Sequence, residues 1–348
     1  MGNRQFIIPI FIPHKGCPND CVFCNQRKIT GQSSAYDYKK IDKEISTALS
    51  TINLNKNPIV EIAFYGGSFT AINSKSQEAL LSIAKKYIDQ YQLQGIRIST
   101  RPDYINEAIL NRLKKYGVRI IELGVQSLNE DVLEASNRGH KRDIVYKSAQ
   151  LIKDYGFTLG IQLMIGLPGD NGEKSIDTVK SVIDLQPDIS RIYPTLIIKD
   201  TTLEEMYNQG LYQPLSLDEA VELSKKMYHL LFTNNIQVIR IGLQPTKNIL
   251  EGEDVVAGPF HSSFRSLVMS SYIYDLIVKA IGDFSGDTVA FELNNKDISY
   301  LVGDRKSNKI KIIEKYSLKK FKIETNSEIE RGKIKVKIEN NIKEIRFS

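Results

Sequence analysis

Apolar runs rich in β-branched residues alternate with stretches of helical periodicity through the first 245 or so residues of the chain. Seven such runs occur: FIIPIFI (6–12), IVEIAFY (59–65), IRIST (96–100), RIIELGV (119–125), TLGIQLMIG (158–166), SRIYPTLII (190–198) and IQVIRIG (236–242). This alternation is typical of βαβ units wound around a parallel sheet. A β/α barrel accommodates about 250 residues as one unit. The sequence therefore predicts an α/β fold with one large barrel-like domain.

Helix starts and a change of period divide the chain further. Ser74 and Gln77 fit a capping box before a helical stretch, and SLDE at 216–219 opens another in the same way. From about residue 286 the chain consists of short segments in which apolar and polar residues alternate, such as KIKVKIEN. This pattern indicates an antiparallel sheet with one solvent-exposed face. We predict a barrel over 1–250 and a small β-rich α+β domain over 251–348, entered through a helix at 261–280.

The net charge of +6 is concentrated in the tail, because residues 296–348 hold 15 Lys and Arg against 8 Asp and Glu. Such a tail could bind a nucleic-acid backbone, but lysines that alternate with isoleucine also protect an exposed sheet edge. The solvated face is the favoured interpretation. The apolar stretch at the N-terminus is too short for a membrane span and is interrupted by Pro9 and Pro13. We expect a cytoplasmic protein without membrane contact.

All three cysteines, Cys17, Cys21 and Cys24, lie within eight positions, directly after the first apolar run. An odd number of closely spaced thiols does not suit a disulfide framework, so we expect reduced thiolates that bind a metal. A cubane of four irons normally takes four cysteines, so three would leave one iron open to another ligand. Zinc held by these cysteines and His14 is the alternative.

The C-x3-C-x2-C loop, with Phe23 before its last cysteine, resembles the signature of the radical S-adenosylmethionine (SAM) enzymes. The resemblance implies a partial (β/α)6 barrel in which Cys17, Cys21 and Cys24 bind a [4Fe-4S] cluster and Phe23 lies near the adenine of SAM. It also implies reductive cleavage of SAM to a 5′-deoxyadenosyl radical that abstracts hydrogen from a substrate. An electron donor such as flavodoxin or ferredoxin is then an expected partner.

Polar motifs follow four further runs, where the carboxyl ends of strands form the active face of β/α barrels. They are YGGSF (65–69), STRPDYI (99–105), ELGVQSLNEDVLEASNRGH (122–140) and MIGLPGD (164–170). The first three resemble the radical core of the Elongator catalytic subunit and related uncharacterised bacterial proteins, and MIGLPGD resembles the equivalent segment of radical SAM enzymes. By this resemblance the SAM contacts are Gly66, Gly67, Ser68, Thr100, Gln126, Ser127, Arg138, Gly166 and Leu167, with Arg138 paired to the methionyl carboxylate. Ser99 departs from the glutamate that related enzymes often carry, which puts one cofactor contact in doubt.

The substrate stays open at this point, with a tRNA base as one candidate. The roughly 100 residues after 250 hold no visible acyl-CoA loop, so we expect no acetyltransferase domain there. Two alternatives remain. An enzyme like the oxygen-independent coproporphyrinogen dehydrogenase shares the GVQS and GLPG elements, and a non-catalytic Fe-S or zinc module could bind RNA.

Overall fold

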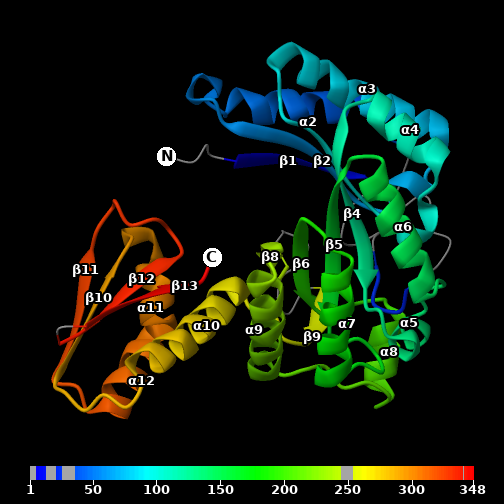
Figure 1. Cartoon of the computed structure of the whole chain (residues 1–348). Coiled ribbons are helices and arrows are strands. Elements are labelled where there is room, and N and C mark those ends of the chain that lie inside the picture. Colours follow the sequence, from blue (N-terminus) through cyan, green and yellow to red (C-terminus); the bar gives the residue numbers. More distant parts are fainter. Residues whose placement is uncertain (1–4, 13–20, 26–35, 244–253, 340) are drawn as a thin grey trace.

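A single curved sheet of seven parallel strands forms the larger part of the molecule in the computed structural model, which describes residues 5–12, 21–25, 36–243, 254–339 and 341–348 (Figure 1). Its strands, in spatial order, are β1 (Gln5–Ile12), β2 (Ile59–Gly66), β3 (Gly95–Thr100), β4 (Val118–Gln126), β5 (Thr158–Ile165), β6 (Ile189–Pro194) and β8 (Gln237–Ile241). Each strand pairs in parallel with the next along the chain, which gives a partial barrel. Each of the seven predicted runs contributes one strand to this sheet, and the seventh strand extends the expected six. The end of the run at 190–198 instead forms part of a separate ribbon.

Helices cover the outer face of the sheet (Figure 1). They are α2 (Tyr38–Ser50), α3 (Ser74–Tyr91), α4 (Glu107–Lys115), α6 (Arg142–Asp154), α7 (Gly172–Asp184) and α9 (Leu217–Thr233), with the short α5 (Glu130–Ala135) and α8 (Thr202–Asn208) near the ends of strands. The strand side chains that face these helices are apolar and fully buried, as Ile62, Leu123 and Leu163 illustrate. Burial of this layer removes most of the apolar strand surface from water and drives the packing.

The two predicted capping boxes have different outcomes. The box at Ser216 and Glu219 is confirmed, since each side chain bonds the backbone of the other at the start of α9. The box at Ser74 is wrong. The N-cap of α3 is Asn73, and Gln77 instead donates to the carbonyls of Thr70 and Ile72, where it holds the turn that precedes the helix.

The C-terminal part packs on the barrel through α10 (Phe264–Ile281), which lies beside α9 (Figure 1). It continues with β10 (Thr288–Leu293), α11 (Ile298–Val302), α12 (Ser307–Tyr316), β11 (Lys320–Thr325), β12 (Lys333–Ile338) and β13 (Asn341–Arg346). The buried face of β12 carries Ile334, Val336 and Ile338, as its alternation predicts. The Tyr228 hydroxyl of α9 donates to the Phe347 carbonyl at 2.5 Å and ties the chain end to the barrel.

The predicted antiparallel sheet needs correction at one edge. Strands β10, β12 and β13 are antiparallel, but β11 pairs with β10 in parallel because α11 and α12 carry the chain back before it enters the sheet. The expected boundary near residue 250 lies outside the described residues. A two-stranded antiparallel ribbon, β7 (Ile197–Ile198) with β9 (Val255–Ala257), follows β6. Within the described ranges, no helix combines the length and apolar character needed to traverse a bilayer.

Candidate active site

The described part of the cysteine loop is fixed against the carboxyl end of the sheet by backbone bonds. The Val22 amide donates to the Ser136 carbonyl at 3.2 Å, and its carbonyl accepts from Leu203 at 2.8 Å. Asn25 donates its side-chain amide to the Lys199 carbonyl at 2.9 Å. These bonds hold Cys21, which is buried, and Cys24, which is partly exposed, at the loop between α5 and α6. Cys17 and His14 lie outside the described residues.

Two arginines surround the Cys21 thiol. Arg138 approaches Sγ of Cys21 with Nη1 at 3.2 Å, and its Nη2 donates to the Gly124 carbonyl. Arg101 lies 3.8 Å from the same sulfur, forms an ion pair with Asp103 at 2.9 Å and donates to the Arg138 carbonyl at 2.5 Å. Two guanidinium groups therefore lie against a cysteine that the sequence predicts as a metal ligand. Arg101 was not among the predicted residues, although its position in STRPD after a strand was the available signal.

Gln126 and Arg138 present buried polar atoms toward the same place. Oε1 of Gln126 and Nε of Arg138 have no hydrogen-bond partner among the residues that the structure describes. A Cβ atom at Gly124 would lie 3.1 Å from Nε2 of Gln126 and 3.9 Å from Nη2 of Arg138, so this glycine keeps the two side chains within reach of each other. Buried polar atoms without partners are costly, and in a native structure they commonly mark a ligand site.

The predicted Ser68 and Thr100 lie together but bond each other. Oγ of Ser68 and Oγ1 of Thr100 are 2.8 Å apart, Thr70 Oγ1 lies 2.5 Å from Thr100 Oγ1, and the Arg101 amide donates to Ser68 at 3.0 Å. This hydroxyl cluster joins the loops after β2 and β3. Gly66 in the same loop has φ of 108°, a conformation that favours glycine. Gly67 lies beside it and is buried.

The remaining predicted residues are spread around the rim. Ser127 faces α7, with its hydroxyl 3.3 Å from that of Thr178. Gly166, with φ of 72°, donates its amide to Asp170 at 3.0 Å and accepts from Tyr212, which fixes the GLPGD turn beside buried Leu167. Phe23 packs against the small apolar cluster that contains Val22 and Tyr212. The structure thus places Arg138 in contact with Cys21 on one side and near Gln126 at Gly124 on the other.

Charged residues fill part of the inner face of the barrel, where apolar layers are the rule. We call the set Glu61, Arg97, Glu122 and Arg191 the inner-face cluster. Arg97 bonds Glu61 at 2.6 Å and Glu122 at 2.9 Å, and Arg191 bonds Glu122 at 2.5 Å. Sequence reasoning missed this cluster, although each member interrupts an apolar run and is therefore visible in the sequence.

The inner-face cluster predicts a specific loss of stability in acid. Burial alone would raise the pKa of Glu122, but Arg191 and Arg97 outweigh it and hold that pKa below its usual range. The contribution to stability is therefore complete above the unfolded pKa of about 4.3 and is lost as pH falls through the lower folded pKa. In Arg191→Met the pKa of Glu122 in the folded state should rise. The free energy of unfolding of this variant, measured in urea, should therefore decrease less between about pH 5 and about pH 3 than that of the wild type. Parallel pH profiles for the two proteins would refute this assignment.

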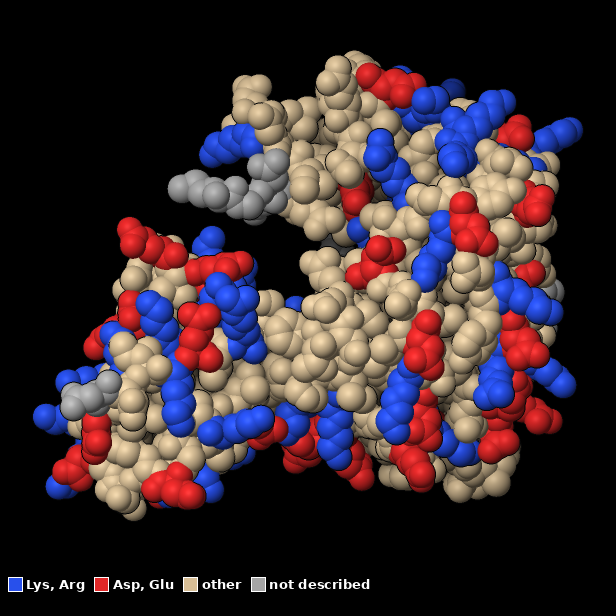
Figure 2. All heavy atoms as spheres, viewed as in Figure 1, with Lys and Arg blue, Asp and Glu red and all other residues tan. Residues whose placement is uncertain are grey.

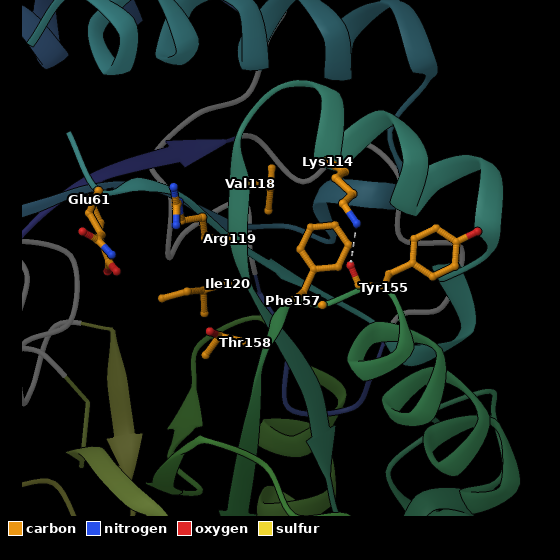
Figure 3. Close-up of a pocket in the computed structure, with 10 residues that line it drawn as sticks. Glu61, Lys114, Val118, Arg119, Ile120, Tyr155, Phe157 and Thr158 are labelled. Atoms are coloured by element: carbon orange, nitrogen blue, oxygen red, sulfur yellow. Dashed lines mark hydrogen bonds between the residues drawn. The ribbon is translucent and has the colours of Figure 1, made fainter. Parts of the chain in front are cut away.

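A cavity of about 230 Å³ lies at the opposite, amino end of the strands (Figure 3). Its lining includes Glu61, Arg119, Phe157 and Thr158, and Lys114 at its edge donates to the Tyr155 carbonyl at 3.0 Å. Residues at this end of a β/α barrel usually serve stability. The cavity is therefore separate from the cysteine loop.

Comparisons with known proteins identify the family of the chain. A family profile described as "Radical SAM superfamily" matches residues 11–182, and one described as "Radical_SAM C-terminal domain" matches residues 187–273. The chain belongs to the radical SAM superfamily. The match indicates an enzyme, and this superfamily generally uses a [4Fe-4S] cluster and SAM.

Two curated relatives that the chain matches are much longer proteins. The chain is 33% identical over 184 residues to the tRNA uridine(34) acetyltransferase of Methanocaldococcus jannaschii, covering 47% of this chain and 34% of that protein. It is 34% identical over 191 residues to Elongator complex protein 3 of Saccharomyces cerevisiae, covering 49% and 34%. The chain thus spans about a third of the length of these relatives.

A solved structure, the Elp3 of Methanocaldococcus infernus with an N-terminal deletion, superposes with a TM-score of 0.61 at 23% identity. The superposition covers 80% of this chain and 63% of that one. At this identity the likeness concerns the fold, which is the partial radical SAM barrel that the sequence predicts.

Proposed function

We propose that Cys17, Cys21 and Cys24 bind a [4Fe-4S] cluster and that Gln126 and Arg138 bind the methionyl part of SAM beside it. The observation that supports this is the meeting of Cys21, Arg138 and Gln126 at the carboxyl end of the sheet. The unpartnered atoms suit an amino acid, because Oε1 of Gln126 accepts from an ammonium and Nε of Arg138 donates to a carboxylate.

When bound, the cluster and SAM would supply one-electron cleavage of the sulfonium and hydrogen-atom abstraction from the substrate. The chain contributes positioning. Arg101 and Arg138 position Cys21 through contacts with its Sγ, and the hydroxyl cluster around Thr100 fixes the loop that follows Gly66 at the end of β2. Burial of these groups excludes water from the site and strengthens their electrostatic interactions.

Replacing Arg138 by glutamine should weaken SAM binding while the cluster stays in place. Loss of one charge-assisted hydrogen bond is worth about 1.5–3 kcal/mol, so we expect the dissociation constant to rise at least about tenfold. Equilibrium dialysis with labelled SAM measures it, and iron analysis checks the cluster. The matched control is Arg142→Gln, on the exposed start of α6, which should bind SAM as wild type does. Equal affinity in the two variants would remove Arg138 from the site.

Gly66→Ala tests the role of the loop after β2. The φ of 108° makes alanine strained there, and Gly117, with φ of 82° at a turn before β4 and open space around it, carries the same kind of strain away from the site. We expect both alanine variants to lose about 1 kcal/mol of unfolding free energy. Only Gly66→Ala should also bind SAM less tightly. If both variants bind SAM alike, the loop has no part in cofactor binding.

We further propose that the substrate is RNA, with a tRNA uridine as the first candidate, because the relatives named above include tRNA uridine(34) acetyltransferases. The test uses tRNA from cells grown in deuterated medium, incubated with reconstituted protein, SAM and reduced flavodoxin. Deuterium in the 5′-deoxyadenosine, measured by mass spectrometry, shows that the hydrogen came from the RNA. Formation of unlabelled 5′-deoxyadenosine would exclude RNA as the hydrogen donor.

A further inference from the structure

Two tyrosines converge on the mouth side of the inner-face cluster. The Tyr65 hydroxyl of β2 accepts from Arg191 Nη2 at 2.8 Å, and the Tyr193 hydroxyl of β6 accepts from Nη1 of the same guanidinium at 3.5 Å. The guanidinium also lies over the Tyr65 ring, with 5.3 Å between its carbon and the ring centroid. The Arg191 guanidinium therefore bonds two phenol oxygens, one from β2 and one from β6.

The tyrosines lie next to the candidate SAM site. Tyr65 directly precedes Gly66 on β2, and Tyr193 directly precedes the last residue of β6. Both side chains are half-buried, and both contact the Arg191 guanidinium of the inner-face cluster. Reacting groups in a β/α barrel lie over this end of the strands.

The inner-face cluster supports these two hydroxyls at a cost in stability. Buried ion pairs are often no more stabilising than apolar side chains of the same volume, so stability alone does not explain four charged groups here. The chain also makes room for them, since a Cβ at Gly160 would lie 2.8 Å from Cγ of Glu122. Gln162 adds a bond to Glu122 at 3.1 Å and another to Ser99 at 2.8 Å. Such a fully bonded set is a rigid base for the groups above it.

Both phenols have a proton to donate. Burial is the main cause that raises the pKa of Tyr65 and of Tyr193, so both stay protonated. Each oxygen already accepts from Arg191. Within the described residues, the Tyr193 proton has no acceptor, and the Tyr65 proton has only Glu122 at 3.5 Å, the limit of a hydrogen bond. Two phenol hydroxyls that both contact the Arg191 cation can donate to one acceptor oxygen.

We propose that Tyr65 and Tyr193 form a substrate subsite that binds an acceptor oxygen, held in place by Arg191 and Glu122. This rests on the proposed function, because the occupant is the substrate of the radical reaction. The acceptor oxygen belongs either to the carbonyl of a pyrimidine base or to a small carboxylate. Both present the lone pairs that two phenol donors require.

The test measures binding of two probes to the reconstituted full chain by fluorescence and calorimetry: a short RNA stem-loop with uridines in its loop, and sodium acetate. The proteins are wild type, Tyr65→Phe and Tyr193→Phe. Tyr87→Phe is the matched control, because its hydroxyl donates to the Asp42 carbonyl at 3.0 Å on the helical side of the sheet. SAM binding and 5′-deoxyadenosine formation are measured on the same preparations.

The subsite predicts that each phenylalanine variant raises the dissociation constant of one probe about fivefold or more, while Tyr87→Phe leaves it unchanged. Weaker RNA binding identifies a base carbonyl as the occupant, and weaker acetate binding identifies a carboxylate. If both variants bind both probes as wild type does and still form 5′-deoxyadenosine, the subsite is refuted and the proposed function stands. If wild type binds a probe through the tyrosines but forms no 5′-deoxyadenosine, the proposed function fails and the binding site stands.

Discussion

Cys21→Ala will reduce the iron bound after anaerobic reconstitution from about four atoms per chain to less than one. The site has three thiols within eight residues and no surplus ligand among them. Loss of one leaves two thiolates, too few to retain a cubane against free sulfide and chelators. The rate of SAM cleavage should fall at least about a hundredfold, which corresponds to an activation free energy roughly 3 kcal/mol higher. Iron and sulfide analysis with chromatography of the nucleoside products measures both effects.

The control for this variant is Ser136→Ala. Ser136 is buried in the same region, its carbonyl accepts from Val22, and its hydroxyl has no partner in the described part of the chain. The alanine variant should keep its iron, which separates loss of a ligand from disturbance of the loop. An iron content near four in Cys21→Ala would contradict the assignment. Zinc in wild type that disappears in this variant would instead support the Cys3His alternative.

Arg97→Met will destabilise the fold by about 3–5 kcal/mol, because it removes one partner from a buried ionic set. Among the described residues, Glu61 then keeps the 3.5 Å bond from Gln5, whereas Glu122 keeps Arg191 and Gln162. Both Arg97 and Glu122 are almost fully buried, so solvent screens the lost interaction little. Urea unfolding at about pH 7, followed by circular dichroism, gives the free energy.

Two further variants distinguish this cause from a general effect of methionine. Lys180→Met breaks the exposed pair with Asp177 and should change stability by no more than about 1 kcal/mol. The double variant Arg97→Met with Glu61→Gln should recover part of the loss, because it removes the carboxylate left without a cation. If the double variant is less stable than Arg97→Met, charge burial is not the reason.

The barrel could be predicted from the sequence because its strands are local and sequential. Each run pairs with the next one along the chain, so the order of runs is also the order of strands. The parallel edge strand β11 could not be predicted in this way. Its partner β10 precedes it by two helices, and nothing in the local pattern of Lys320–Thr325 specifies direction. Strand direction there depends on how α11 and α12 pack, which is tertiary information.

The residues of the candidate site could be predicted where a motif follows a strand. The charged residues within the strands were harder to predict. Cys21 comes from the cysteine loop, and Gln126 and Arg138 come from the motif at 122–140. Their shared location follows from the rule that carboxyl ends of parallel strands share one face. Their hydrogen bonds do not follow from that rule. Ser68 and Thr100 show this, since their hydroxyls bond each other. The inner-face cluster needed the register of five strands before its partners could be named.

The basic tail forms a mixed surface in the folded chain. Lys337 of β12 pairs with Glu292 of the adjacent β10 at 3.0 Å and with Glu324 of β11, one strand further, at 2.6 Å. Figure 2 shows acidic and basic side chains interspersed over the C-terminal part of the molecule. Such pairing lowers the positive field that a nucleic-acid backbone would meet. The arrangement favours the solvated-face interpretation of the alternating lysines.

The most direct test of the account is to reconstitute the full chain anaerobically with iron and sulfide, reduce it in the presence of SAM, and analyse the products. We predict about four irons per chain, broad visible absorption, and 5′-deoxyadenosine that appears only with both reductant and SAM. Zinc without iron, or an intact cluster that never yields 5′-deoxyadenosine, would contradict it.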